Sequence, residues 1–370
     1  MERSNKKLTV LFIFFISFQV FALPRFSLKF NDKCSDCHVN PTGGLIRNES
    51  GFHFGKNVIG LISPREKDFP VTPKLTENIS FGLDYRTQFI YSQEKKRSDF
   101  QDMSGSIYLN AGFSKKIDVI ARYDFVQSIW EGYGVLKILP NDSYIKIGSF
   151  TPYYGIRLDD HTAYTRGGDF GLLFSTGNIQ GLLYNPFYIE TGIEIGANIS
   201  DVALLTASVG KSKFSSSLTT DPTFTSRIEL TPAIDNIGLL FGGSFSSVKT
   251  RSFGNILNTN IYGGFAGFGT KYFSLIGEYD IAKDYLALNV TSSALMLEAT
   301  YQFMIGLEAV VRYDRFDPNT SISSDEFSRI VLGFEFFPFS FIEVRPQYRI
   351  QLEEPSKDNN SFVLQFHFWY

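Results

Sequence analysis

Both cysteines of this 370-residue chain lie in one short motif, CSDCH, at residues 34–38. Two thiols three residues apart can each add to a vinyl group of one haem, and the adjacent imidazole can then bind the iron. A zinc site needs four ligands, and only His53 stands near the motif as a fourth. The motif therefore predicts one covalent haem c on Cys34 and Cys37, with His38 as the proximal iron ligand. The alternatives are a Cys34–Cys37 disulfide and a zinc site.

Two further histidines are candidates for the distal iron ligand. His53 follows His38 by 15 residues, so a short loop can close it over the haem. His367 is the alternative, because it lies on the polar face of the last expected strand, near the end where the haem segment is expected. A water molecule in the sixth position is a third possibility, and it would permit ligand or peroxide chemistry.

Residues 1–22 have the features of a secretory signal peptide: a basic start, an apolar run from Leu8 to Val20, and small residues before the expected cleavage point. A transmembrane helix needs about 20 apolar residues, and this run is shorter and contains Ser17 and Gln19. We therefore expect the mature chain to begin near Leu23, outside the cytoplasm.

Aromatic residues make up 16% of the chain, the net charge is −3 and the mean hydropathy is −0.05. Apolar and polar residues alternate in segment after segment towards the C-terminus. This period of two is typical of outer-membrane strands, whose lipid-facing side is apolar and whose lumen side is polar. A soluble β-sandwich is the alternative. The alternation is clearest in the last segment, with Phe362, Leu364, Phe366, Phe368 and Tyr370 on one face.

The sequence predicts an all-β fold, a transmembrane antiparallel outer-membrane β-barrel spanning residues 77–370. At about 18 residues per strand and connection this length accommodates about 16 strands, with a range of about 14 to 18. Tight turns at 114–117 and 304–306 alternate with longer polar stretches, which we expect to be extracellular loops. These stretches are 94–103, 215–225, 317–327 and 353–360.

Residues 23–76 form a different, irregular segment that is rich in glycine and proline and contains the CSDCH motif. So short a segment cannot bury a sufficient core alone. We expect the haem to supply part of that core, or the barrel to enclose the segment as a plug. Either way the segment is expected at the periplasmic mouth or inside the lumen, since a barrel of this size can hold a plug.

Asp159, Asp160 and His161 form a second group of possible ligands. Carboxylates with an imidazole suit Fe(II) or Mn(II), so the group is a candidate extracellular metal site. The aromatic and charged stretch around it could instead fold into the lumen as a constriction. A solvated extracellular loop is the third interpretation.

A signal peptide, one CxxCH motif near the mature N-terminus and a barrel ending in an aromatic strand together resemble the fused monohaem cytochrome-porins of iron-oxidising bacteria. Residue by residue the match is limited to Cys34, Cys37 and His38. The resemblance implies an electron conduit, rather than an enzyme, between an extracellular donor or acceptor such as Fe(II) and a periplasmic c-type cytochrome or other electron carrier.

Two other functions stay open at this point. One is a diffusion porin with an N-terminal plug and a Cys34–Cys37 disulfide, and the other is a haem-based sensor or peroxidase. The sequence contains no Ser-His-Asp constellation, phosphate loop or basic stripe that would favour a hydrolase or a nucleic-acid-binding protein. The partners we expect are outer-membrane lipid, the electron carrier and an extracellular metal ion.

Overall fold

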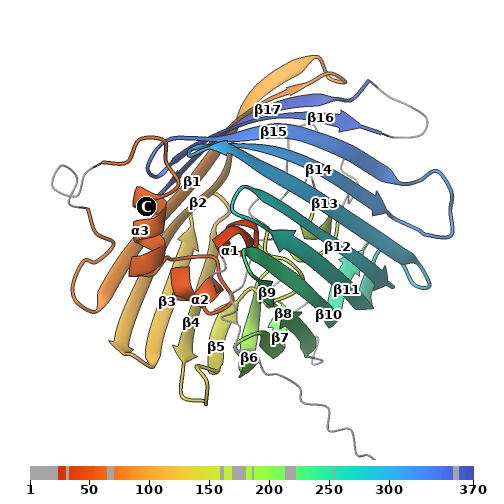
Figure 1. The fold of residues 1–370 in the computed structure, drawn as a ribbon. Helices are drawn as coiled ribbons and strands as arrows, with labels where there is room; N and C mark the ends of the chain where they lie inside the picture. Colours follow the sequence, from red (N-terminus) through yellow and green to blue (C-terminus); the bar gives the residue numbers. More distant parts are fainter. Residues whose placement is uncertain are drawn as a thin grey trace, which may run out of the picture.

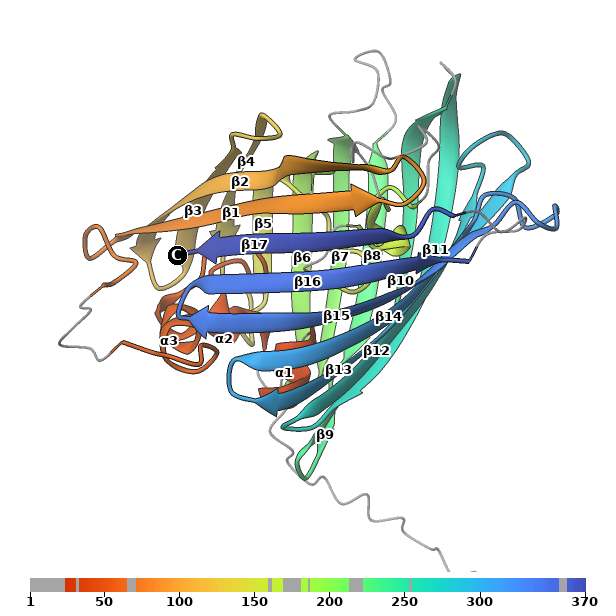
Figure 2. The same ribbon diagram turned by 90° about the horizontal axis from the view of Figure 1, so that it is seen from above.

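Antiparallel strands make up most of the chain that the computed structural model describes (Figures 1 and 2). The strands run next to one another in chain order around a ring. The described residues are 24–30, 33–64, 71–158, 162–168, 181–185, 187–212, 222–252, 255–352 and 358–370. The predicted signal peptide, residues 1–22, lies outside this range.

The helices are short, and none in the described part of the chain is long and apolar enough to cross a membrane. They are α1 (Pro24–Phe30), α2 (Cys34–Cys37), α3 (Glu49–Asn57) and the 3-10 turn η1 (Tyr164–Arg166). The strands are β1 (Ile79–Ser92), β2 (Arg97–Ser114), β3 (Ile117–Asp124), β4 (Ile129–Leu136), β5 (Tyr144–Phe150), β6 (Glu190–Ser200), β7 (Ala203–Ser212), β8 (Thr223–Leu230), β9 (Ala233–Ile234), β10 (Ile237–Ser252), β11 (Asn255–Gly269), β12 (Phe273–Lys283), β13 (Thr291–Met304), β14 (Leu307–Asp317), β15 (Phe327–Phe339), β16 (Ile342–Gln351) and β17 (Ser361–Trp369).

The first and last strands close the ring. β1 pairs antiparallel with β17 over nine residue pairs, from Asp84 opposite Trp369 to Ser92 opposite Ser361. Of the 17 strand segments in the described residues, β8 and the two-residue β9 both pair with β10 and share one place in the ring, which leaves 16. The predicted closed antiparallel barrel of about 16 strands is confirmed.

The two faces of the wall differ as the sequence pattern predicts. On β14, Arg312 and Asp314 point inward and are buried, whereas Val311, the residue before Arg312, is 49% exposed on the outside. On β17, His367 is buried and Phe368 is 39% exposed. The exposed apolar residues suit contact with lipid tails, and the inward acids and bases pair with one another.

One end of the barrel carries the short turns and the C-terminus. The turns at 115–116, 201–202, 305–306 and 340–341 lie at this end, which in outer-membrane barrels faces the periplasm.

The prediction of a loop over residues 94–103 is wrong. Residues 93–96 form the turn there, and β2 already begins at Arg97, opposite Ser92, because the β1–β2 hydrogen-bond ladder continues through these polar residues.

The N-terminal helices lie within the ring at this same end (Figures 1 and 2). The segment was predicted to be irregular, but its described residues include α1, α2 and α3. The chain after α3 runs along the β15–β16 turn, where the Leu61 N–H donates to the Phe337 carbonyl at 2.8 Å and Ile62 forms a parallel bridge with Phe339.

An arginine on the outer wall tests the lipid-facing assignment. We expect Val311→Arg, near the middle of β14, to lower the free energy of unfolding by about 2–4 kcal/mol, because a charge at the bilayer midplane loses its hydration. Val311→Leu is the control and should leave stability within about 0.5 kcal/mol. Urea unfolding in phospholipid vesicles measures both; equal stability of the two variants would place Val311 away from lipid.

Candidate functional site

The CSDCH motif is held by a single helical turn. In α2 the Lys33 N–H donates to Asp36 Oδ2 at 2.9 Å, and the His38 N–H donates to the Cys34 carbonyl at 2.8 Å. Residues three apart share a helical face. This turn therefore places Cys34 and Cys37 on the same side of α2, with His38 directly after it.

A tight turn follows the motif and returns the chain to it. Asn40 Nδ2 donates to the Gly43 carbonyl at 2.6 Å, and Gly43 and Gly44 have φ values of +77° and +73°, which favour glycine. The returning strand places Arg47 opposite His38, and the Asn48 N–H donates to the Cys37 carbonyl at 3.0 Å. Residues 38–48 thus form a compact loop around the histidine.

Helix α3 then packs closely on α2. Asn48 begins α3 as its N-cap, accepting a hydrogen bond from the Gly51 N–H at 2.9 Å. A Cβ at Gly51 would lie 2.0 Å from the Cys37 carbonyl oxygen. Glycine at this position therefore permits the close approach of the two helices.

Helix α1 is fixed to the barrel wall by two buried ion pairs. Arg25 forms a bidentate pair with Glu335 of β15, and Lys29 Nζ lies 2.8 Å from Glu308 Oε2 of β14. Leu28, between them in the sequence, is 1% exposed and packs against Gly269 at the end of β11. Buried charges are costly unless they are paired, so these contacts hold α1 in one place.

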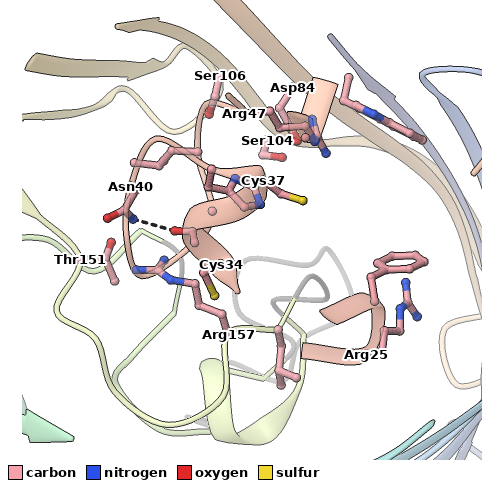
Figure 3. Close-up of a pocket in the computed structure, with 18 of the residues that line it drawn as sticks. Arg25, Cys34, Cys37, Asn40, Arg47, Asp84, Ser104, Ser106, Thr151 and Arg157 are labelled. Atoms are coloured by element: carbon pink, nitrogen blue, oxygen red, sulfur yellow. Dashed lines mark hydrogen bonds between the residues drawn. The ribbon is translucent and has the colours of Figure 1, made fainter. Parts of the chain in front are cut away.

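The motif borders a large cavity inside the barrel. Its volume is about 400 Å³, within the usual range of ligand pockets of about 300–1,000 Å³. Cys34, Cys37 and His38 all line it. In Figure 3, Arg157 lies beside Cys34, and Arg47 and Asp84 lie on the side of Cys37. The wall is completed by aromatic residues from the plug and the strands, among them Phe26, Phe54, Tyr108, Tyr133, Phe150 and Tyr153.

The electrostatics of the motif keep its histidine neutral. Burial, assisted by the charges of Arg47 and Arg157, lowers the pKa of His38 to about 3. Its Nδ1 is buried and has no hydrogen-bond partner among the described residues. A neutral imidazole with an unsatisfied nitrogen is the form that binds a metal.

Cys34 and Cys37 are not joined by a disulfide in the structure, and the Cys34 thiol differs from a metal-binding thiolate. Burial, with a contribution from Glu229, raises the pKa of the Cys34 thiol to about 12. A zinc site requires deprotonated thiols, so this environment disfavours it. Among the described residues no group of three or more His, Cys, Asp or Glu side chains is arranged to hold a metal ion.

The stretch after β5 folds inward and contacts the N-terminal segment through Arg157 and Thr42. Ile156 and Ala163 are 0% exposed, the Ile156 N–H donates to Glu278 Oε2 at 2.9 Å, and Arg166 Nη2 lies 2.6 Å from the same carboxylate. For residues 151–158 and 162–168 the solvated-loop interpretation is therefore wrong. The sequence pattern could not distinguish a loop inside the lumen from a solvated loop. The carboxylate that binds this loop is Glu278 on β12, which is far away in the sequence.

The remaining predicted site residues are distributed differently. His53 lies on α3 with its ring against Phe52, and it is outside the set of residues that line the cavity. His367 does line the cavity, but its ring nitrogens each lie 2.9 Å from a carboxylate oxygen, Nδ1 from Glu343 and Nε2 from Asp84. To bind an iron, His367 would have to give up one of these carboxylate contacts, and both histidine assignments stay predictions. Asp159, Asp160 and His161 lie outside the described residues.

Three basic residues with structural roles were missed at the sequence level. Arg25 and Lys29 are four residues apart on one face of α1, and that spacing was a readable signal of a helix with a basic face. Arg157 contacts Thr42, 115 residues earlier in the chain, and no local pattern indicates such a contact.

The barrel and its inward segments define a porin-type outer-membrane barrel. No protein-family model and no curated protein matches the sequence. Solved structures share the fold. The high-pH structure of Pseudomonas putida OprB has a TM-score of 0.61 at 12% identity and covers 85% of this chain and 99% of its own. The outer membrane channel DcaP of Acinetobacter baumannii has 0.55 at 11%, covering 81% and 100%. Salmonella typhi OmpF has 0.55 at 12%, covering 79% and 98%.

Removing a buried carboxylate tests the attachment of α1. We expect Glu335→Gln to lower the free energy of unfolding by about 3–5 kcal/mol, because Arg25 and Arg345 then lose a shared partner. The control is Glu326→Gln, which removes the partner of the partly exposed Arg315 and should cost less than about 1 kcal/mol. Urea unfolding compares the two, and similar losses would show that the α1 ion pair contributes little.

A methyl group at Gly51 tests the contact between α2 and α3. We expect Gly51→Ala to separate the helices from each other at a cost of about 1–3 kcal/mol, since the added atom meets the Cys37 carbonyl. Trypsin should then cleave after Lys33 and Arg47 about tenfold faster. Gly132→Ala, whose added Cβ meets nothing within 4 Å, is the control and should match the wild type. An unchanged cleavage rate in Gly51→Ala would contradict the close packing.

Proposed function

We propose that this protein is an outer-membrane barrel that carries one covalent haem c in its lumen and conducts electrons. The observation that carries the proposal is that Cys34, Cys37 and His38 all border one cavity of about 400 Å³ inside the barrel. The two thiols would form the thioethers, and His38 would be the proximal ligand. When bound, the haem would supply reversible one-electron exchange.

The chain's own residues fit that group. Burial keeps the His38 imidazole neutral, and its Nδ1 lacks a partner among the described residues. The aromatic lining would cover an apolar ring system and exclude water, while Arg47 and Arg157 at the same cavity would face the acidic groups at the edge of the haem. In this proposal residues 23–76 are the haem segment and plug, residues 77–370 the barrel, and residues 1–22 the signal peptide.

The position of the motif suggests which end of the barrel each redox partner would meet. The helices lie at the end with the short turns, which we assign to the periplasm. A periplasmic c-type cytochrome or other carrier would therefore meet this end, and the extracellular donor or acceptor, such as Fe(II), the other. A metal site at Asp159, Asp160 and His161 remains part of the proposal only as the prediction made from sequence.

A diffusion porin is the second candidate, and the fold comparisons favour it over the conduit. The shared fold includes DcaP, an outer membrane channel, and the comparisons contribute nothing towards a haem. In this alternative the N-terminal helices would plug the lumen, and Cys34 and Cys37 would form a disulfide. A haem-based sensor or peroxidase is the third and would need an open iron position.

Haem attachment separates the candidates. The chain would be expressed with a c-type haem maturation system, and its denatured band from outer membranes tested for peroxidase-active haem and a pyridine haemochrome spectrum. We expect covalent haem in the wild type and its loss in Cys37→Ala, because one thioether disappears. Ser35→Ala, on the exposed side of the same helix, is the matched control and should keep the haem.

Conductance decides the alternative. A colourless wild-type band together with steady ion conductance in a planar bilayer would replace the conduit with the diffusion porin. Haem that survives denaturation, with low conductance, is the result expected for the conduit. His53→Ala should retain covalent haem in both the peroxidase test and the pyridine haemochrome spectrum, since His53 does not line the cavity.

A further inference from the structure

Arg157 connects the inward stretch after β5 to the plug. Its Nε donates to the Thr42 carbonyl at 2.8 Å, and its Nη2 donates to Thr42 Oγ1 at 3.2 Å. The same side chain passes over the turn, where its Nη1 lies 3.3 Å from the position that a Cβ on Gly44 would occupy. One guanidinium thus joins a segment that enters from one end of the barrel to a segment that sits at the other.

The turn at residues 42–44, which Arg157 contacts, packs directly against Cys34. A Cβ on Gly43 would lie 3.0 Å from Cys34 Sγ, so the turn and the thiol are in close contact. Thr42 is 0% exposed and cannot shift without disturbing its surroundings. A change in the position of the Arg157 side chain would therefore reach Cys34 through residues 42–44.

Arg157 also brings a positive charge to the cavity. Its side chain lines the cavity together with Cys34 and His38, and its guanidinium carbon lies 5.7 Å from the Tyr153 ring centroid. Lys146, the other cation near Thr42, is paired with Glu194 at 2.7 Å. Charges act over longer distances in a low-dielectric interior than in water.

We infer that Arg157 is a positioning residue that fixes the turn at residues 42–44 against the cysteine motif and, through its charge, sets the midpoint potential of the bound haem. The inference rests on the proposed function. Oxidised haem iron carries one more positive charge than reduced iron, so a nearby cation favours the reduced form. Removing the charge should lower the midpoint potential. Removing only the hydroxyl contact to Thr42 should change the midpoint potential much less, because the charge remains.

The test is a spectroelectrochemical titration of the haem-loaded barrel in detergent. Arg157→Gln should lower the ratio of reduced to oxidised haem at a fixed potential by about three- to tenfold; tenfold corresponds to 59 mV for one electron. Arg157→Lys keeps the charge, and Thr42→Val removes the Thr42 hydroxyl but keeps the carbonyl that accepts from Arg157. Each of these variants should change the ratio less than twofold. Lys271→Gln, in the exposed β11–β12 turn, is the charge-matched control and should not change it.

The outcomes separate this inference from the proposed function. A wild-type barrel without covalent haem overturns the proposed function and this inference with it. Haem that is present, with the same midpoint potential in Arg157→Gln, Lys271→Gln and the wild type, overturns only the role of Arg157. If Arg157→Gln does not fold, Arg157→Lys and Thr42→Val still decide. A tenfold fall of the reduced-to-oxidised ratio in both of them would contradict an effect of charge.

Discussion

The structure depends on one constraint, which is that a membrane offers no water to the backbone of the wall. Every N–H and C=O in the spanning strands must therefore pair with a neighbouring strand, and the pairing of β1 with β17 removes the last free edges. Closure with 16 strands fixes the width of the lumen. The segments inside the lumen must therefore fit this width and pair with the polar residues of the inner wall.

The filling comes from two segments of the same chain, and charge pairing holds both. Helix α1 pairs Arg25 and Lys29 with carboxylates on β15 and β14, and the stretch after β5 pairs Arg166 with Glu278 on β12. Because each buried charge costs several kcal/mol without a partner, the wall and its contents stabilise each other. The polar residues of the inner face therefore also serve as partners for the charged residues of helix α1 and of the stretch after β5.

The barrel could be predicted from the sequence, and the arrangement inside it could not. A period of two is a local property, so the alternation around Val311 or Phe368 reported the two faces of the wall correctly. The CSDCH motif is local too, and it does border a cavity. His53 was expected near that cavity on sequence distance alone, but α3 turns it towards Phe52. The contact of Arg157 with Thr42 depends on the closed barrel, which brings distant segments together.

The closed barrel also bears on the order of events in the proposed haem attachment. Thioether formation needs an accessible and reactive thiol, yet Cys34 is half-buried in the folded lumen, and desolvation there raises the pKa of its thiol to about 12. The Gly43 turn covers its sulfur as well. Attachment would therefore precede the docking of residues 24–64 into the ring. Once β1 and β17 have paired, the ion pairs of Arg25 and Lys29 would fix helix α1 against the wall.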